Sequence, residues 1–229
     1  MDKIQVRILY HNFNNMPLFL AKLTQRGHLI HSMNDLNVLY CDTMCNDTPM
    51  SKEFMQLPHT TLRRMCYMTV AVVGLSTKAV SQLRTHAKHL TFLSTSTQYS
   101  AYNDKKNNYV IPEDDINLKI FLEQAQKNYE ALLNIGFDKD TASYLLPQAL
   151  RKVLVISGSL ADWEYVLSTR LCNRNTKEVQ HICELIVQKV KEICGEEFTY
   201  NMYPSCVTDK CHEGKMSCGH KYIICTRRV

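Results

Sequence analysis

The sequence predicts a single α+β domain in which a mixed sheet is combined with long helices. Its 229 residues, 45% of them apolar, are enough to bury one sizeable core. Runs with the two-residue alternation of strands lie near the start of the chain, whereas helical periodicity dominates the second half. No internal repeat is present. We expect residues 1–200 to form the domain and residues 201–229 to form a cysteine-rich tail.

The first elements follow from local patterns. Gln5–Tyr10 alternates and predicts a strand. Pro17–Arg26 predicts a short helix that ends at Gly27. The polar, turn-rich stretch Leu36–Lys52 receives no assignment. Arg63–Val73 is rich in β-branched and aromatic residues, which predicts a second strand.

Ser76 is placed to cap a helix after the second predicted strand. The apolar residues of this helix recur at helical spacing: Ala79, Val80, Leu83, Ala87 and Leu90. The stretch Leu90–Tyr102 is dense in hydroxyls and has no helical periodicity. It is either a surface connection or a ligand loop, since hydroxyls and free backbone N–H groups suit phosphates and base edges.

Two helices are predicted next. Pro112 and the three acidic residues after it begin a long helix that runs to Gly136. Asp138 caps a short helix ending at Leu146.

The last elements are a strand and two helices. Lys152–Ser157 predicts the strand, and Ser159 and Asp162 resemble a capping box for the helix that follows it. This helix carries Leu160, Trp163, Val166 and Leu167. The final helix spans about 175–194, ends at Gly195, and has a predicted buried face of Val179, Ile182, Ile186, Val190 and Ile193.

Composition excludes few functions. The formal net charge of +5 fits an anionic ligand such as a nucleotide, but it also fits an ordinary solvated surface. No apolar run approaches the roughly 20 residues of a membrane helix, and the N-terminus has no signal-peptide core. We therefore expect a cytoplasmic protein with no membrane partner. The ten cysteines should be mostly reduced thiols, with Cys66, Cys172, Cys183 and Cys194 as small core residues.

The tail carries a second candidate site. Cys206, Cys211, Cys218 and His220 have a spacing that loosely resembles a zinc knuckle, with Cys225 beyond them. Structural zinc sites more often begin with two cysteines separated by two residues. The alternative is a tail of reduced thiols, and we expect no metal site.

Three segments, Leu145–Arg170, Leu171–Val179 and Pro204–Gly219, together resemble one family, that of the flavin-dependent thymidylate synthases. Leu145–Arg170 has the family's order of a Leu-Pro pair, a strand, a turn of small residues and a helix. Leu171–Val179 keeps part of a family pattern through Arg170, Cys172, Arg174 and Glu178. Pro204–Gly219 looks like the tail of a clostridial branch. The resemblance covers nearly the whole chain, and it implies the α+β fold of that family.

The family's signature is Arg-His-Arg, a polar stretch, and then Ser-x-Arg-Tyr. Here Ser96 and Tyr99 match, whereas Gln98 stands at the substrate arginine. Arg-His-Arg falls on residues 85–87 or 86–88, so that at most His86 or Lys88 is preserved. Val153 stands where the family has another substrate arginine.

The resemblance implies an enzyme that uses FAD, NADPH and methylenetetrahydrofolate to methylate C5 of dUMP or a related pyrimidine nucleotide, as a homotetramer without nucleic acid. The implied cofactor residues are His59, Thr61, His86, Lys88 and Ser159, where Ser159 replaces a flavin-contacting Asn. The implied substrate residues are Gln82, Ser96, Gln98, Tyr99, Arg151 and Arg170, and Arg170 is also the catalytic candidate. The flavin and folate carry the difficult steps, so no protein nucleophile is needed, and no convincing Cys–His pair is present.

The lost arginines leave alternatives open. Gln98 donates hydrogen bonds without charge, and a charge-assisted bond is worth about 1.5–3 kcal/mol against about 0.5–1.5 for a neutral one. Neighbouring basic residues are candidates to replace the missing charge: Arg84, Lys88, Arg151, Lys152 and Arg170. For each except Arg170, an exposed basic residue without function is the simpler interpretation. His86 is either a flavin or folate contact or a half-buried structural histidine. A non-catalytic flavin- or nucleotide-binding paralogue and a zinc-bearing nucleic-acid binder remain as rival functions.

Overall fold

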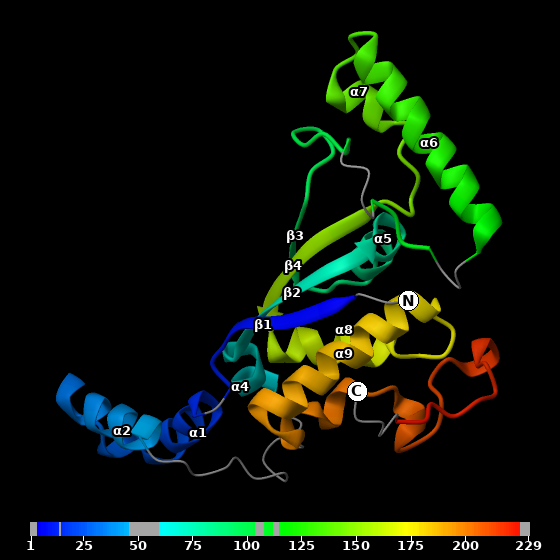
Figure 1. Ribbon diagram of the computed structural model, residues 1–229. Coiled ribbons are helices and arrows are strands. Elements are labelled where there is room, and N and C mark those ends of the chain that lie inside the picture. Colours follow the sequence, from blue (N-terminus) through cyan, green and yellow to red (C-terminus); the bar gives the residue numbers. More distant parts are fainter. Residues whose placement is uncertain (1–3, 14, 46–59, 104–107, 112–114, 225–229) are drawn as a thin grey trace.

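A four-stranded sheet forms the centre of the computed structural model, which describes residues 4–13, 15–45, 60–103, 108–111 and 115–224 (Figure 1). The strands have the order β1-β2-β4-β3. Their bounds are Gln5–His11 for β1, Tyr67–Ser76 for β2, Thr91–Ser94 for β3 and Arg151–Ser159 for β4. The predicted α+β class is confirmed. All three described pairings are antiparallel rather than mixed, as is typical of a sheet with one face on the core.

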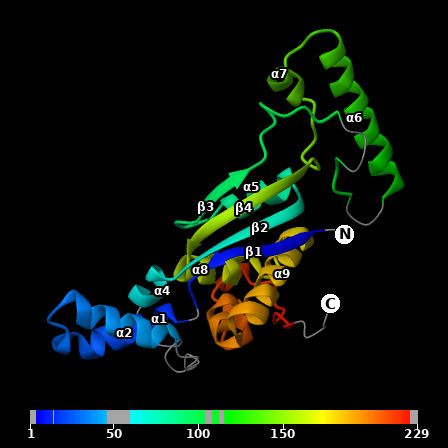
Figure 2. The same cartoon turned by 60° about the vertical axis from the view of Figure 1, so that its left-hand side comes forward.

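Two helices cover one face of this sheet. They are α8 (Leu160–Arg170) and α9 (Lys177–Cys194), which lie side by side beneath the strands in Figures 1 and 2. The core between the layers includes Met68, Val70, Val72, Leu154, Ile156, Trp163, Leu167, Ile182 and Ile186. The shorter helix α5 (Thr77–Arg84) follows β2 directly and contacts β2, β4 and α9.

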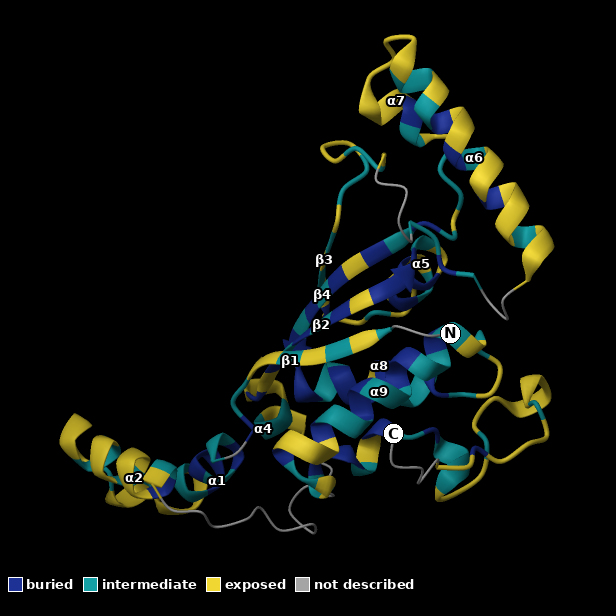
Figure 3. Ribbon diagram, in the orientation of Figure 1, coloured by how far each residue is buried: buried dark blue, intermediate teal, exposed yellow. Residues whose placement is uncertain are grey.

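The opposite face of the sheet carries exposed apolar side chains. Val73 and Val153 pair across β2 and β4 and are 42% and 37% exposed, while Leu93 on β3 is 71% exposed. Figure 3 shows exposed and buried stretches alternating along the strands of the sheet. The alternation arises because successive side chains of a strand point to opposite faces.

Two helical arms extend from opposite ends of the sheet (Figures 1 and 2). At one end lie α1 (Met16–Arg26) and α2 (Met33–Cys45), next to the short α4 (Thr60–Met65). At the other end lie α6 (Ile116–Asn134) and α7 (Lys139–Ser143). Short 3-10 turns occupy Gly27–Leu29, Glu196–Met202, Ser205–Val207 and Gly214–Met216. No helix in the described ranges is long and apolar enough to cross a membrane.

Several predicted elements are confirmed at or near their expected ends. These are the strand at Gln5, the helices ending at Arg26 and Cys194, and the caps made by Ser76, Asp138 and Ser159. Asp115 caps α6, whereas Pro112 and the two acidic residues after it lie outside the described residues.

Other predictions were wrong in part. The unassigned stretch after Leu36 belongs to α2 as far as Cys45. Arg63 lies in α4 instead of the predicted strand. That strand begins at Tyr67 and continues through Gly74 to Ser76. Gly74, with φ +90°, sits at a bulge that lets the strand continue where we expected it to end.

The remaining corrections concern element ends. The predicted loop Leu90–Tyr102 begins with β3, which pairs with β4 through Thr91–Ser94. Helix α5 ends at Arg84, so Ala87 and Leu90 lie beyond it. Helix α7 ends at Ser143 instead of Leu146. Ile193 is 49% exposed rather than buried, because the buried face of α9 continues from Val190 to Cys194 and leaves Ile193 beside it.

Candidate functional site

The start of α5 is fixed by a serine and a glutamate from distant parts of the chain. The Ser76 hydroxyl accepts a hydrogen bond from the Ala79 N–H at 3.0 Å, which caps the helix. Glu178, in the first turn of α9, accepts from both the Ser76 N–H and the Ser76 hydroxyl, each at 2.7 Å. Since Ser76 is almost fully buried, these bonds fix the direction in which α5 leaves the sheet.

The end of α5 is held by Arg170, the last residue of α8. Its guanidinium donates to the backbone carbonyls of Gln82 and Thr85, and it donates to Asn175 Oδ1 at 3.2 Å. These carbonyls belong to the last turn of α5, where the helix dipole is negative and favours a cation. Arg170 is 8% exposed, and burial lowers the pKa of its guanidinium from the ordinary value. The side chain therefore caps a helix within the protein.

The loop after α5 has a constrained backbone. His86 and Lys88 have φ angles of +62° and +52°, in the left-handed region that non-glycine residues rarely adopt. The Lys88 ammonium lies 4.2 Å from the centre of the Tyr165 ring on α8. Leu90 packs so closely on Gly158 of β4 that a Cβ there would meet its side chain. Such backbone strain persists only where the surroundings fix it, and it occurs often at functional sites.

This loop presents a group of exposed nitrogen donors. Arg84, His86, Lys88 and His89 are all exposed. The Arg84 guanidinium is held by a hydrogen bond to the Ser94 hydroxyl at 3.1 Å. Two permanent cations and two imidazoles within six residues suit an anionic group such as a diphosphate, because charge-assisted donors bind phosphate oxygens strongly. We call residues 84–89 the basic loop.

A second cluster surrounds Lys152 near the start of β4. Its ammonium donates to the Thr95 carbonyl at 3.1 Å and to the Tyr102 hydroxyl at 3.2 Å, and it lies 5.0 Å from the centre of the Tyr102 ring. The neighbouring Arg151 donates to the Tyr109 carbonyl at 3.2 Å. Both cations therefore bind protein carbonyls.

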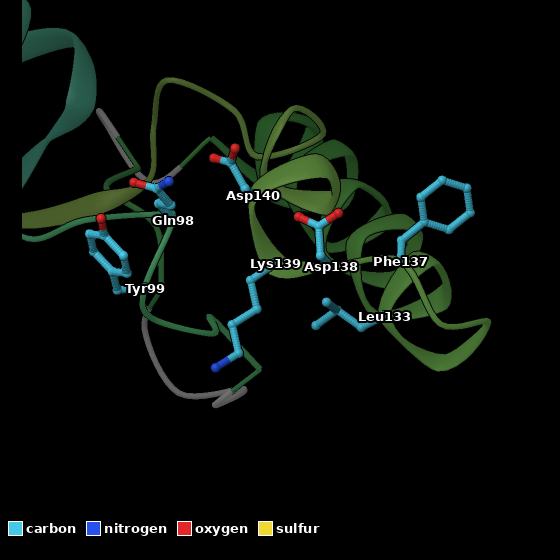
Figure 4. A pocket seen from close by; sticks show the side chains of 7 residues that line it. All are labelled: Gln98, Tyr99, Leu133, Phe137, Asp138, Lys139 and Asp140. Atoms are coloured by element: carbon cyan, nitrogen blue, oxygen red, sulfur yellow. The ribbon is translucent and has the colours of Figure 1, made fainter.

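The segment between Thr95 and Tyr102 contains three of the predicted substrate residues. The Ser96 hydroxyl accepts from the Gln98 N–H at 3.1 Å, and Tyr99 is 77% exposed. We call residues 95–102 the hydroxyl loop. Gln98 and Tyr99 line an open cavity of about 650 Å³ together with residues from the α6–α7 arm (Figure 4). These are Leu133, Phe137, Asp138, Lys139 and Asp140.

The charges of this cavity are mixed. Lys139 supplies one cation, while Asp138 and Asp140 supply two carboxylates. Hydrogen bonds from Thr141 lower the pKa of Asp138, so its carboxylate stays ionised at neutral pH. With one cation against two carboxylates, the cavity lining by itself is therefore not an anion site.

The structure brings some predicted site residues together and separates others. Gln82 and Arg170 are in contact, and the Gln82 side chain accepts from the Thr176 hydroxyl at 2.7 Å. Ser159 lies at the opposite end of β4 from Lys152, ~23 Å away at 3.3 Å per residue. Its hydroxyl is 2.5 Å from the Asp162 carboxylate and caps α8. Thr61 is exposed on α4, and His59 lies outside the described residues.

Sequence reasoning did not assign a role to several residues that shape these clusters. Glu178 was noticed only as part of a pattern, and no local signal points to its contact with Ser76, which lies 102 residues earlier in the chain. The Tyr102 hydroxyl accepts and donates hydrogen bonds and its ring faces the Lys152 ammonium, yet a tyrosine at the end of a polar stretch gives no signal for these contacts. The buried ion pair of Arg63 with Glu164, 3.0 Å apart, joins α4 to α8 and was also missed.

Two buried thiols are unsuited to act as nucleophiles. Burial raises the pKa of the Cys66 and Cys183 thiols to about 12, so they stay protonated. No group of three or more histidine, cysteine or acidic residues in the described ranges is arranged to hold a metal ion. In the tail, the Cys206 sulfur accepts from the Tyr222 N–H, and Tyr222 packs into the main core. Cys225 lies outside the described residues.

Comparisons with known proteins agree on one family. The family model of the thymidylate synthase complementing protein matches residues 18–195. The flavin-dependent thymidylate synthase of Geobacter sulfurreducens is 22% identical over 174 residues, which cover 73% of this chain and 74% of that protein. The same enzyme of Clostridium tetani is 25% identical over 174 residues, covering 66% and 68%.

Solved structures share the fold at low sequence identity. Thymidylate synthase X of Helicobacter pylori, solved with FAD and dUMP, is 15% identical with a TM-score of 0.68, covering 87% of this chain and 99% of that one. The UMP/dUMP methylase PolB of Streptomyces cacaoi, solved with 5-Br dUMP, is 14% identical with a TM-score of 0.65, covering 89% and 96%. Because the family model spans most of the chain, this protein belongs to the family of the flavin-dependent thymidylate synthases.

Proposed function

We propose that this protein is an FAD-dependent enzyme of the thymidylate synthase type, acting on dUMP or a related pyrimidine nucleotide. The observation that carries the proposal is the basic loop, residues 84–89. It presents Arg84, His86, Lys88 and His89 to solvent from a strained backbone, in a chain that belongs to this family. Relatives of the same fold were solved with FAD and with dUMP or its 5-bromo derivative.

The residues of the basic loop fit the group that the family implies. The diphosphate of FAD carries charge that Arg84 and Lys88 would bind, with His86 and His89 as further donors. When bound, the flavin supplies the hydride that completes the methyl group, after reduction by NADPH and transfer of a one-carbon unit from methylenetetrahydrofolate. The task of this chain is then to bind and orient the reactants and to exclude water. Thr61 and His59 are further flavin-side candidates.

The substrate side is weaker in charge than the flavin side. Gln98 and Val153 bring no cation, while Arg170, Arg151 and Lys152 already donate to groups of the protein. Ser96, Gln98 and Tyr99 of the hydroxyl loop, together with Gln82, remain to hydrogen-bond the nucleotide. Since transition-state stabilisation depends on a few placed charges, we expect flavin binding to be retained and methylation of dUMP to be slow.

We further propose that the protein is a homotetramer in the cytoplasm, with its flavin bound at subunit interfaces. The exposed apolar face of the sheet around Val73, Val153 and Leu93 supports this proposal. An uncovered apolar face of this kind is expensive in water and is typical of an interface. Light scattering at micromolar concentration should give four times the chain mass of 26.5 kDa, and a monomer mass would contradict it.

One experiment tests the activity. The purified protein should be yellow and show flavin absorbance, and it is then incubated with FAD, NADPH, methylenetetrahydrofolate and dUMP while thymidylate is measured. Flavin binding with slow thymidylate formation is the expected result. A repeat of the incubation with UMP in place of dUMP tests the related nucleotide. Bound flavin with no methylated product from either nucleotide indicates a non-catalytic paralogue. This is the second candidate, because Arg170, Arg151 and Lys152 already donate to groups of the protein. A colourless protein that does not take up FAD contradicts the proposal.

A further inference from the structure

Lys152 is a buried cation with no carboxylate partner in the described part of the chain. It is 7% exposed, and its ammonium is satisfied by the Thr95 carbonyl at 3.1 Å and the Tyr102 hydroxyl at 3.2 Å. Burying an ammonium is costly unless it is hydrogen-bonded. A leucine or methionine at this place in β4 would avoid that cost, so the function of the ammonium must lie in the contacts that it makes.

Those contacts close the hydroxyl loop at both of its ends. Thr95 is also fixed to β4 by a hydrogen bond from its N–H to the Val153 carbonyl at 3.2 Å. The Tyr102 hydroxyl, which accepts from Lys152, has one hydrogen to donate, and it lies 3.2 Å from the Ser96 carbonyl. The chain of donors therefore runs from the ammonium through the phenol to the backbone of Ser96. Residues 96–101 therefore form an arch, and the residues at its two ends, Thr95 and Tyr102, both bind the Lys152 ammonium.

The far end of this arch is anchored to α6. The Tyr102 carbonyl accepts from Gln126 Nε2 at 2.6 Å and from Asn108 Nδ2 at 3.3 Å. The Tyr102 N–H donates to the hydroxyl of Tyr129, which is fully buried. Tyr102 thus has partners for its N–H, carbonyl and hydroxyl groups. Its ring also faces the Lys152 ammonium at 5.0 Å.

We propose that Lys152 is a positioning residue that sets the conformation of the hydroxyl loop, so that Ser96, Gln98 and Tyr99 meet the nucleotide in one arrangement. The inference rests on the proposed function, because it takes this loop as the nucleotide-binding segment. It differs from a role in which the ammonium turns outward and binds the substrate phosphate directly. The first role affects every ligand of the loop, whereas the second affects only ligands with a phosphate.

Deoxyuridine and dUMP separate the two roles, because they differ only in the phosphate. Calorimetry on the flavin-loaded protein compares wild type with Lys152→Met, which keeps the length of the stem and removes the charge. Removal of a charge-assisted anchor corresponds to a change of about 10- to 100-fold in affinity. We expect Lys152→Met to weaken dUMP and deoxyuridine by the same factor, and Lys152→Arg to recover part of the loss.

Tyr102→Phe supplies an independent test, since it keeps the ring and removes only the hydroxyl that links Lys152 to Ser96. It should weaken both ligands, and the double variant with Lys152→Met should be no weaker than Lys152→Met alone, because both act on one network. Lys78→Met on α5 is the matched control, since Lys78 is exposed and its side chain makes no described contact. Flavin content should be the same in all variants.

Each other outcome is decisive. Loss of affinity for dUMP alone assigns Lys152 to the phosphate and overturns the inference. Unchanged affinity for both ligands, or additive effects of the two substitutions, also overturns it. These results leave the proposed function intact, provided that wild type binds flavin and dUMP. A wild-type protein that binds neither ligand nor flavin refutes the proposed function along with this inference. If Lys152→Met does not fold, Tyr102→Phe carries the comparison.

Discussion

Replacing Arg170 by methionine should destabilise the protein even in the absence of ligand. The substitution removes the donors to the Gln82 and Thr85 carbonyls and to Asn175. A hydrogen bond to a charged group contributes about 1.5–3 kcal/mol, and a cation at a helix C-terminus contributes a further ~0.3–1 kcal/mol. The three contacts are made by one guanidinium and act as a unit, and Thr85 is an exposed residue, so water can offset part of the loss. We therefore expect the free energy of unfolding to fall by about 3 kcal/mol.

Urea denaturation of the apoprotein at fixed concentration measures this change. With a slope of about 3 kcal/mol per molar urea for a chain of this size, the midpoint should fall by about 1 M. Arg174→Met is the control, because Arg174 forms an exposed ion pair with Glu213 at 3.2 Å and such pairs contribute at most about 1 kcal/mol. An unchanged midpoint for Arg170→Met, combined with loss of dUMP binding, would show that the guanidinium serves the ligand and that the helix-capping argument is wrong.

Three further predictions follow from single contacts. Ser76→Ala should lower the free energy of unfolding by about 2–4 kcal/mol in urea melts, because it removes the helix cap and leaves the Glu178 carboxylate without one donor. A loss no larger than that caused by replacing an exposed serine with alanine would contradict this prediction. Lys88→Met should reduce flavin affinity measured by equilibrium dialysis while Tyr165→Phe, which keeps the ring, should not. Asp138→Asn should cost stability above pH 3.8, the ordinary pKa. Because the pKa of Asp138 is lowered in the folded protein, the difference in stability between wild type and variant should vanish as the pH falls through that lowered pKa. A difference that persists at still lower pH would show that the Asp138 carboxylate is not its source.

Local signals in the sequence were enough for much of the fold. Ser76, Asp138 and Ser159 were assigned as caps because a short polar side chain just before an apolar helical pattern is typical of a helix N-terminus. The family was identified from segments whose order survives low identity, and this prediction is confirmed. Element types in these regions followed from interactions within a few residues.

Long-range contacts account for what the sequence did not predict. The role of Arg170 depends on carbonyls 85 and 88 residues earlier in the chain, so no local pattern distinguishes a helix cap from a substrate contact. Whether Arg170 also touches the nucleotide stays a prediction. Strand β3 was read as loop because its four residues carry little periodicity, and it exists through its pairing with β4. Arg63 was placed in a strand because β-branched neighbours outweighed the helical turn that packs on α8.

The bulge at Gly74 has a consequence for how the chain tolerates insertion and deletion. Val73 pairs with Val153 and Leu75 pairs with Lys152, so β2 uses two steps where β4 uses one. Deleting Gly74 would leave Leu75 opposite Lys152 and facing the core, because it takes out the unpaired residue of the bulge and restores one-to-one pairing. The deletion would instead remove the local bend and the positive-φ step just before Ser76, which begins α5. A residue inserted among the paired positions of β2, in contrast, would turn the residues beyond it to the opposite face of the sheet. The paired positions of β2 are therefore less tolerant of insertion than the bulge is of deletion.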